Sequence, residues 1–174
     1  EPRLACRALT SCALQSCKDI TAAALSALAA ACPRLEELDL RGCLRLPSLT
    51  LAAPQLRTLA LDGCAKLSEP RLECPRLSSL SLRGCTALTD GALSAALSAC
   101  PHLTALDLTA CAALRAPALS HGRLGEVRLN EVPELGALSL RCDALRSLQL
   151  QLPRGLRSCP AEGCVPDPST GPST

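Results

Sequence analysis

Residues 32–43 read CPRLEELDLRGC, and residues 74–85 repeat the phrase as CPRLSSLSLRGC. The part that recurs is L-x-x-L-x-L-x-x-C. Successive side chains of an extended strand point to opposite faces, so L-x-L places two leucines on the same face. The cysteine that follows is a small apolar residue and fits where the chain turns inward. The phrase therefore predicts a short strand with one buried face, followed by a turn.

The same phrase recurs along almost the whole chain. Full copies occupy residues 35–43, 56–64, 77–85 and 103–111, and degenerate copies occupy residues 9–17, 124–132 and 145–153. The central positions are 12, 38, 59, 80, 106, 127 and 148, so the spacings are 26, 21, 21, 26, 21 and 21 residues. A 68-residue unit thus occurs twice, because residues 6–73 align with residues 74–141 without a gap. Such periodicity is the signature of a repeat protein.

One repeat alone buries too little apolar surface to fold, so such units stack into arrays. The sequence predicts an α/β leucine-rich-repeat solenoid, a curved horseshoe with about seven parallel strands on its concave side. We expect this domain to span residues 1–152. Residues 153–174 are rich in proline, serine, threonine and glycine and predict a loop and a disordered tail. No polar cap precedes Cys6, so we expect the chain to be a fragment or to be processed.

The convex side is predicted to alternate between two kinds of segment. Alanine and leucine at helical spacing follow Thr21 and Thr89, which are suitable N-caps, and Pro33 and Pro101 end these helices. The 21-residue repeats have no room for a full helix. They carry a second, shorter phrase that predicts extended or 3₁₀ segments, and its copies occupy residues 46–51, 67–72, 114–119 and 135–140.

Composition excludes several classes of function. The 174 residues are 48% hydrophobic but contain no Phe, Trp, Tyr or Met, so no aromatic ring is available to stack on a base. The formal net charge is only +2 and no long basic run occurs, which argues against nucleic acid as a partner. No apolar stretch is long enough for a transmembrane helix, so no membrane partner is expected.

The thirteen cysteines follow the repeat instead of a metal-ligand or disulfide pattern. Most stand at the turn after the strand or six residues before its centre, and Cys12 takes a strand position. Their even spread predicts buried free thiols, no metal site and no cofactor, in a cytoplasmic or nuclear protein. Cys159 and Cys164 lie outside the repeat and are either free thiols, which we favour, or a pair in an oxidising compartment.

The same reasoning argues against an enzyme. His102 and His121 both occupy repeat positions, and no set of serine, histidine and acid is indicated. No glycine-rich phosphate loop occurs either, because Gly42, Gly63 and Gly84 belong to the turns after the strands. A hydrolase or redox enzyme that uses the cysteines is a remote alternative.

The quoted phrases, together with CTALTD at residues 85–90, resemble the cysteine-containing class of leucine-rich repeats, which is typical of F-box/LRR proteins. The alternation of long and short repeats, with LSEPRLECP at residues 67–75, is similar to the plant and green-algal F-box/LRR-repeat protein 15 type. This resemblance implies the substrate receptor of an SCF ubiquitin ligase. A Skp1-type adaptor would bind through an F-box that is not present in this chain.

The candidate binding surface is the concave face, where strand side chains between and beside the leucines point to solvent. The residues predicted to contact a target protein are Glu37, Asp39, Arg41, Asp62, Arg83, Asp107, Arg128 and Gln149. Arginine is common at binding hot spots, and both signs of charge are mixed, so no single steering field is expected. Two alternatives stay open: a solvated face with no ligand, and a non-ligase scaffold subunit of a larger assembly.

Overall fold

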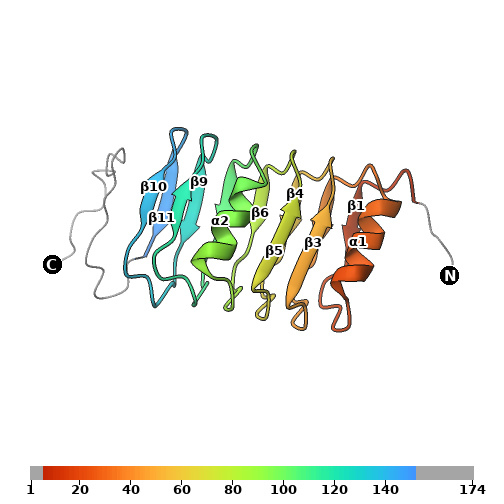
Figure 1. Cartoon of the computed structure of the whole chain (residues 1–174), viewed down its shortest axis with the longest axis horizontal. Helices are drawn as coiled ribbons and strands as arrows, with labels where there is room; N and C mark the ends of the chain where they lie inside the picture. The colour runs from red at the N-terminus through yellow and green to blue at the C-terminus, as the bar shows by residue number, and fades with distance from the viewer. Residues whose placement is uncertain (1–5, 152–174) are drawn as a thin grey trace.

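The computed structural model describes residues 6–151, which form a single row of stacked coils (Figure 1). One side of the row is a seven-stranded sheet in which every neighbouring pair of strands is parallel. Its strands, in spatial order, are β1 (Ser11–Ala13), β2 (Glu37–Asp39), β4 (Thr58–Ala60), β6 (Ser79–Ser81), β7 (Ala105–Asp107), β9 (Glu126–Leu129) and β11 (Ser147–Leu150). The molecule is therefore a parallel β-solenoid with few helices.

The register of this sheet follows the repeat of the sequence. Leu59 pairs with Leu38 on one side and with Leu80 on the other. The same match continues to Cys12 at one end and to Leu148 at the other. This pairing confirms the predicted strand centres, and a shift by one residue would turn the buried leucines toward water.

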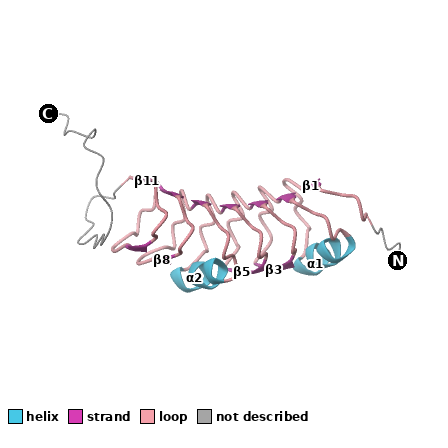
Figure 2. Cartoon of the chain, turned by 90° about the horizontal axis from the view of Figure 1, so that it is seen from above, coloured by secondary structure: helices cyan, strands magenta, loops and turns pink. Residues whose placement is uncertain are grey.

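The opposite side of the row alternates between helices and short strands (Figure 2). Its elements are α1 (Ala22–Ala31), β3 (Ser48–Ala52), β5 (Glu69–Glu73), α2 (Asp90–Ser98), β8 (Ala118–Ser120) and β10 (Ser139–Arg141). The strands form two parallel pairs, β3 with β5 and β8 with β10. The predicted extended form is thus confirmed over the 3₁₀ alternative, since strand pairing satisfies backbone groups that an isolated turn leaves open.

Both helices begin where the sequence predicts. The hydroxyl oxygens of Thr21 and Thr89 accept hydrogen bonds from the backbone N–H groups of Ala24 and Ala92, at 3.2 and 3.4 Å. These threonines therefore act as N-caps. Each helix ends shortly before a Cys-Pro pair, because proline cannot continue the hydrogen-bond pattern.

The core is a continuous aliphatic layer between the two sides. Leu38, Leu40, Leu59 and Leu61 are at most 1% exposed, and the corresponding residues of the next three coils are buried as well. The first and last described coils are less well covered. The prediction that the cysteines are buried is therefore wrong for Cys6, Cys12, Cys17 and Cys142, which are half-buried.

The turns after β2, β4 and β6 use glycine and cysteine for separate reasons. Gly42, Gly63 and Gly84 have φ angles of +74°, +73° and +69°, a conformation that glycine adopts without strain. The thiol of Cys64 then donates a hydrogen bond to the backbone carbonyl of Leu40 in the preceding coil, at 3.3 Å. The cysteine position thus has a polar role besides the small apolar one that the sequence predicts.

His121 stands at a cysteine position of the repeat and makes hydrogen bonds of its own there. Its Nε2 lies 3.0 Å from the carbonyl oxygen of Cys100, while its Nδ1 accepts from the backbone N–H of Arg123. Both histidines contact Arg123, because the guanidinium of Arg123 lies 2.8 Å from Nδ1 of His102. The interpretation of both histidines as structural positions of the repeat agrees with these contacts.

The predicted loop and tail, including Cys159 and Cys164, lie outside the described residues.

Candidate binding surface

The outward face of the seven-stranded sheet, called the sheet face below, carries all the predicted contact residues. In each coil it consists of the side chains before, between and after the two buried leucines. The predicted residues are exposed or half-exposed, and they are Glu37, Asp39, Arg41, Asp62, Arg83, Asp107, Arg128 and Gln149. They do not act as one group, because hydrogen bonds divide them into separate clusters.

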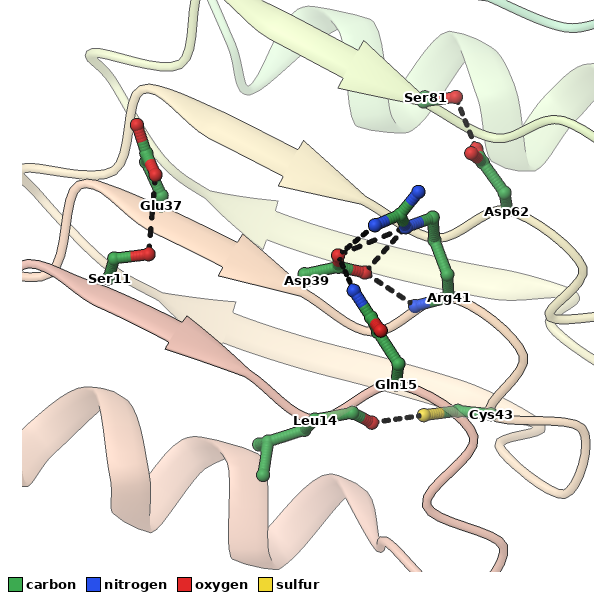
Figure 3. A network of polar contacts seen from close by, with 9 residues as sticks. All are labelled: Ser11, Leu14, Gln15, Glu37, Asp39, Arg41, Cys43, Asp62 and Ser81. Atoms are coloured by element: carbon green, nitrogen blue, oxygen red, sulfur yellow. Dashed lines mark hydrogen bonds and ion pairs between the residues drawn. The ribbon is translucent and has the colours of Figure 1, made fainter.

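The first cluster surrounds Asp39 at the N-terminal end of the sheet (Figure 3). The Arg41 guanidinium donates to this carboxylate, with Nη2 2.6 Å from Oδ2, and the side-chain amide of Gln15 donates to it at 2.5 Å. The backbone N–H of Arg41 also donates to it, at 3.1 Å. Beside this cluster, the Ser11 hydroxyl donates to Glu37 at 3.2 Å.

These contacts hold both charges of the Asp39–Arg41 pair in their ionised forms. Hydrogen bonds from Arg41, with a smaller contribution from Gln15, hold the pKa of Asp39 well below its usual range. The hydrogen bond to Asp39 in turn raises the pKa of Arg41. Arg41 is therefore a neutralised arginine and offers a partner less charge than its exposure suggests.

The second cluster lies in the C-terminal half of the sheet. The Arg128 guanidinium is 2.7 Å from the Glu126 carboxylate and 3.8 Å from that of Asp107. The Asp107 carboxylate also accepts from the backbone N–H of Thr109, at 2.9 Å. Arg128 is thus occupied by two acidic neighbours.

Arg83 lies between these clusters and differs from the other two arginines of the sheet face. Its side chain is exposed. Within residues 6–151, its guanidinium has no hydrogen-bond or ion-pair partner. The nearby Asp62 carboxylate instead accepts a short hydrogen bond from the Ser81 hydroxyl. Arg83 is the one guanidinium of the described sheet face that is free to form a bidentate contact with a partner's carboxylate.

Some positions of the sheet face differ from the sequence-based prediction. Thr109 is expected to point to solvent, yet it is only 7% exposed. The sequence also leaves Gln15, Ser81 and Glu126 out of the contact set, although each binds a member of it. Their place in the repeat register is the one signal in the sequence that brings them near these partners.

A shallow hollow of about 220 Å³ lies on the sheet face over β6, β7 and β9. Serine and alanine side chains form much of its floor, and Asp107, Glu126 and Arg128 line one side. An open, shallow and polar hollow lacks the enclosure with which small-molecule sites bury their ligands. The shape of this hollow is better suited to contact with another protein than to the binding of a small-molecule substrate.

The thiols of the core have the chemistry of structural cysteines. Burial raises the pKa of Cys64 to about 11 and those of Cys100 and Cys111 to about 12. Such thiols stay protonated at neutral pH, and the thiolate is the reactive form. In the described part of the chain, no three histidine, cysteine or acidic residues are grouped so that they could hold a metal ion.

Neither described helix is long and apolar enough to cross a membrane. No family model matches the chain, and no curated protein is similar to it at a significant level.

Proposed function

We propose that this chain is a protein-recognition module whose sheet face binds a target protein. More specifically, we propose a leucine-rich-repeat horseshoe of the cysteine-containing class that serves as the substrate-recognition part of an SCF-type ubiquitin ligase. A separate F-box would recruit the Skp1-type adaptor. The reduced thiols suit a cytoplasmic or nuclear protein, because those compartments keep cysteines reduced.

The repeat assignment is supported by how the cysteine phrase is used. In four successive coils, the turn cysteine donates its thiol to the carbonyl of the second leucine, or its equivalent, in the preceding coil. The residues that define the cysteine-containing class thus have a repeated structural role. This repeated contact supports the proposed repeat class.

The single observation that carries the binding role is the exposed guanidinium of Arg83 at the middle of the sheet face, which has no partner in the described part of the chain. Solenoid proteins use such extended surfaces for binding. Arginine is enriched among residues that dominate binding energy, most of all near the centre of an interface. Small neighbours such as Ala60 and Ala105 leave this region open to a partner's side chains.

The proposed mechanism needs no chemistry from this chain. The sheet face would hold the target, with Arg83 paired to a carboxylate and the fixed ion pairs at Asp39 and Asp107 setting the pattern of charge around it. Such a pattern contributes more to specificity than to raw affinity. Ubiquitin transfer would be carried out by the ligase components that the adaptor brings.

Affinity purification of the full-length protein tests the ligase role. We expect a Skp1-type adaptor to co-purify with the full-length protein and to be missing from a purification of residues 1–174 alone. Full-length protein that folds, as judged by circular dichroism, but recovers no adaptor would refute it. Recovery in a stoichiometric complex without the adaptor would instead support a scaffold subunit.

A further inference from the structure

The turns that lead into the strands of the main sheet form a second surface, called the strand-start edge below. It consists of residues 6–10, 32–36, 53–57, 74–78, 100–104, 121–125 and 142–146. Backbone hydrogen bonds join these turns into a continuous ladder; for example, the N–H of Arg57 donates to Glu36 and that of Ser78 donates to Arg57. Turns that lie far apart in the sequence are thereby placed side by side.

Arginine gathers on this edge although no basic run exists in the sequence. All six of its arginines are exposed, and they are Arg7, Arg34, Arg57, Arg76, Arg123 and Arg146. The only acidic residues of the edge are Glu36 and Asp143, and it has no lysine. The sheet face beside it has five carboxylates and three arginines. The positive charge of the described chain is therefore concentrated on the strand-start edge.

Most of these guanidinium groups form no ion pair within the described part of the chain. Arg57 is paired with Glu36 at 3.3 Å, whereas Arg76 contacts the side-chain oxygen of Gln55 and Arg123 contacts a ring nitrogen of His102. Near the C-terminal end of the edge, Arg123 and Arg146 both line a shallow hollow of about 490 Å³. Gly125 and Ala144 also line it, and so does Glu126 of the sheet face, whose carboxylate is already paired with Arg128 at 2.7 Å. A partner's carboxylate in this hollow would therefore meet two guanidinium groups that form no ion pair within residues 6–151.

We propose that the strand-start edge binds an extended acidic segment of a partner protein. Neighbouring strands lie about 4.8 Å apart, so six steps from the first to the last coil span about 29 Å, and an extended peptide covers that length with about nine residues. Arginine forks match carboxylates in bidentate geometry. The strand-start edge adjoins the sheet face, but the proposal does not depend on what the sheet face binds.

A protein segment suits this edge better than a nucleic acid. Single-stranded nucleic acids are held by a basic groove combined with aromatic side chains that stack on the bases, and this chain has no aromatic residue. A wide polyphosphate duplex would also lie against the carboxylates of the adjoining sheet face. A thin acidic peptide can follow the row of arginines without covering those carboxylates.

The experiment is a fluorescence-anisotropy titration of residues 1–174 with a labelled oligoglutamate peptide of about nine residues, the length derived above. We expect saturable binding that weakens with added salt, because exposed charges are screened. The variant Arg123→Glu/Arg146→Glu should bind at least about fivefold more weakly, because each reversal turns an attraction into a repulsion. Circular dichroism should show an unchanged fold for this exposed pair.

The matched control is Lys18→Glu/Lys66→Glu. It makes the same change in net charge at exposed lysines in the turns that follow the strands. Binding that survives in this control and is lost in the arginine variant supports the proposal. Equal weakening in both variants would show a net-charge effect and overturn it. Tighter binding of an oligothymidylate of equal charge would also overturn it, in favour of a nucleic acid.

Discussion

The Sγ atom of Cys85 lies 3.3 Å from the carbonyl oxygen of Leu61, which belongs to the preceding coil. Both residues are fully buried. The thiol therefore satisfies a carbonyl in the core and joins two coils whose residues are 24 positions apart in the sequence. Burial raises the pKa of this thiol, so it remains a donor at physiological pH.

Replacing Cys85 with alanine should lower the free energy of unfolding by about 1–3 kcal/mol, because it removes a donor from a buried carbonyl and leaves a small cavity. Denaturant unfolding followed by circular dichroism measures the loss. Cys17→Ala is the control, since Cys17 is half-buried and lies in the first described coil. A smaller effect at Cys85 than at Cys17 would contradict the role given to the thiol contact.

Leu59→Asp should unfold the array. Leu59 is 0% exposed and lies on β4, which has a strand on either side, so aspartate there buries an unpaired carboxylate, which costs several kcal/mol. Thermal melting followed by circular dichroism tests this expectation. Leu44→Asp is the control, because Leu44 is 52% exposed and should tolerate the charge. If the Leu59 variant melts like the parent protein, the assigned register is wrong.

Two glycine-to-alanine changes should shift stability in opposite directions. At Gly42, φ is +74° and a new Cβ would lie 2.9 Å from the Ser16 hydroxyl, so alanine should destabilise the protein by about 1 kcal/mol or more. At Gly91, within α2, a Cβ meets nothing within 4 Å, and alanine should stabilise it by about 0.5–1 kcal/mol. Urea midpoints of the two variants provide the measurement, and changes of the same sign would be inconsistent with these backbone conformations.

The Asp39 carboxylate should make stability depend on acid pH. Its pKa in the folded protein lies below that of the unfolded chain, near 3.9, so the stabilisation is complete above this value. It is lost as the pH falls from about 4 toward the lower pKa of the folded state. Asp39→Asn should therefore show a smaller loss of stability between about pH 5 and pH 2, measured by denaturant unfolding at each pH. Parallel curves for parent and variant would rule out this contribution.

Arg83→Ala should preserve the fold and weaken binding to the target protein. Because its guanidinium has no partner among residues 6–151, we expect the free energy of unfolding to change by no more than about 0.5 kcal/mol, but the affinity to fall at least about fivefold. Isothermal titration calorimetry with the purified target measures the affinity. Arg115→Ala is the control, an exposed arginine next to the strand pair on the opposite side of the row. If the two variants lower the affinity equally, the sheet face is not the binding surface.

The strand register could be predicted from the sequence because buried leucines constrain it. A shift by one residue at Leu59 would expose an entire aliphatic column, so periodicity alone determines which residues pair. The N-caps at Thr21 and Thr89 could be predicted for a similar reason, since few side chains can accept from the first N–H groups of a helix.

The pattern of surface contacts could not be predicted in the same way. Asp39 pairs with Arg41 while Arg83, at the equivalent position two coils later, stays free. The difference follows from the residue between the leucines, which is aspartate in one coil and Ser81 in the other, and from side-chain conformations that periodicity does not determine. The arginines of the strand-start edge were missed because they are dispersed in the sequence and gather only when the coils stack.

The spacing of helices on the rear side has a mechanical consequence. An α-helix with its side chains is about 10–12 Å wide, whereas paired strands lie about 4.8 Å apart. Between the β3–β5 pair and the β8–β10 pair, α2 contacts both β5 and β8, so the width of a helix and not the spacing of paired strands separates these neighbours. We expect bending to be concentrated at the helical coils, with straighter segments between them, and each additional 68-residue unit would add one further bend.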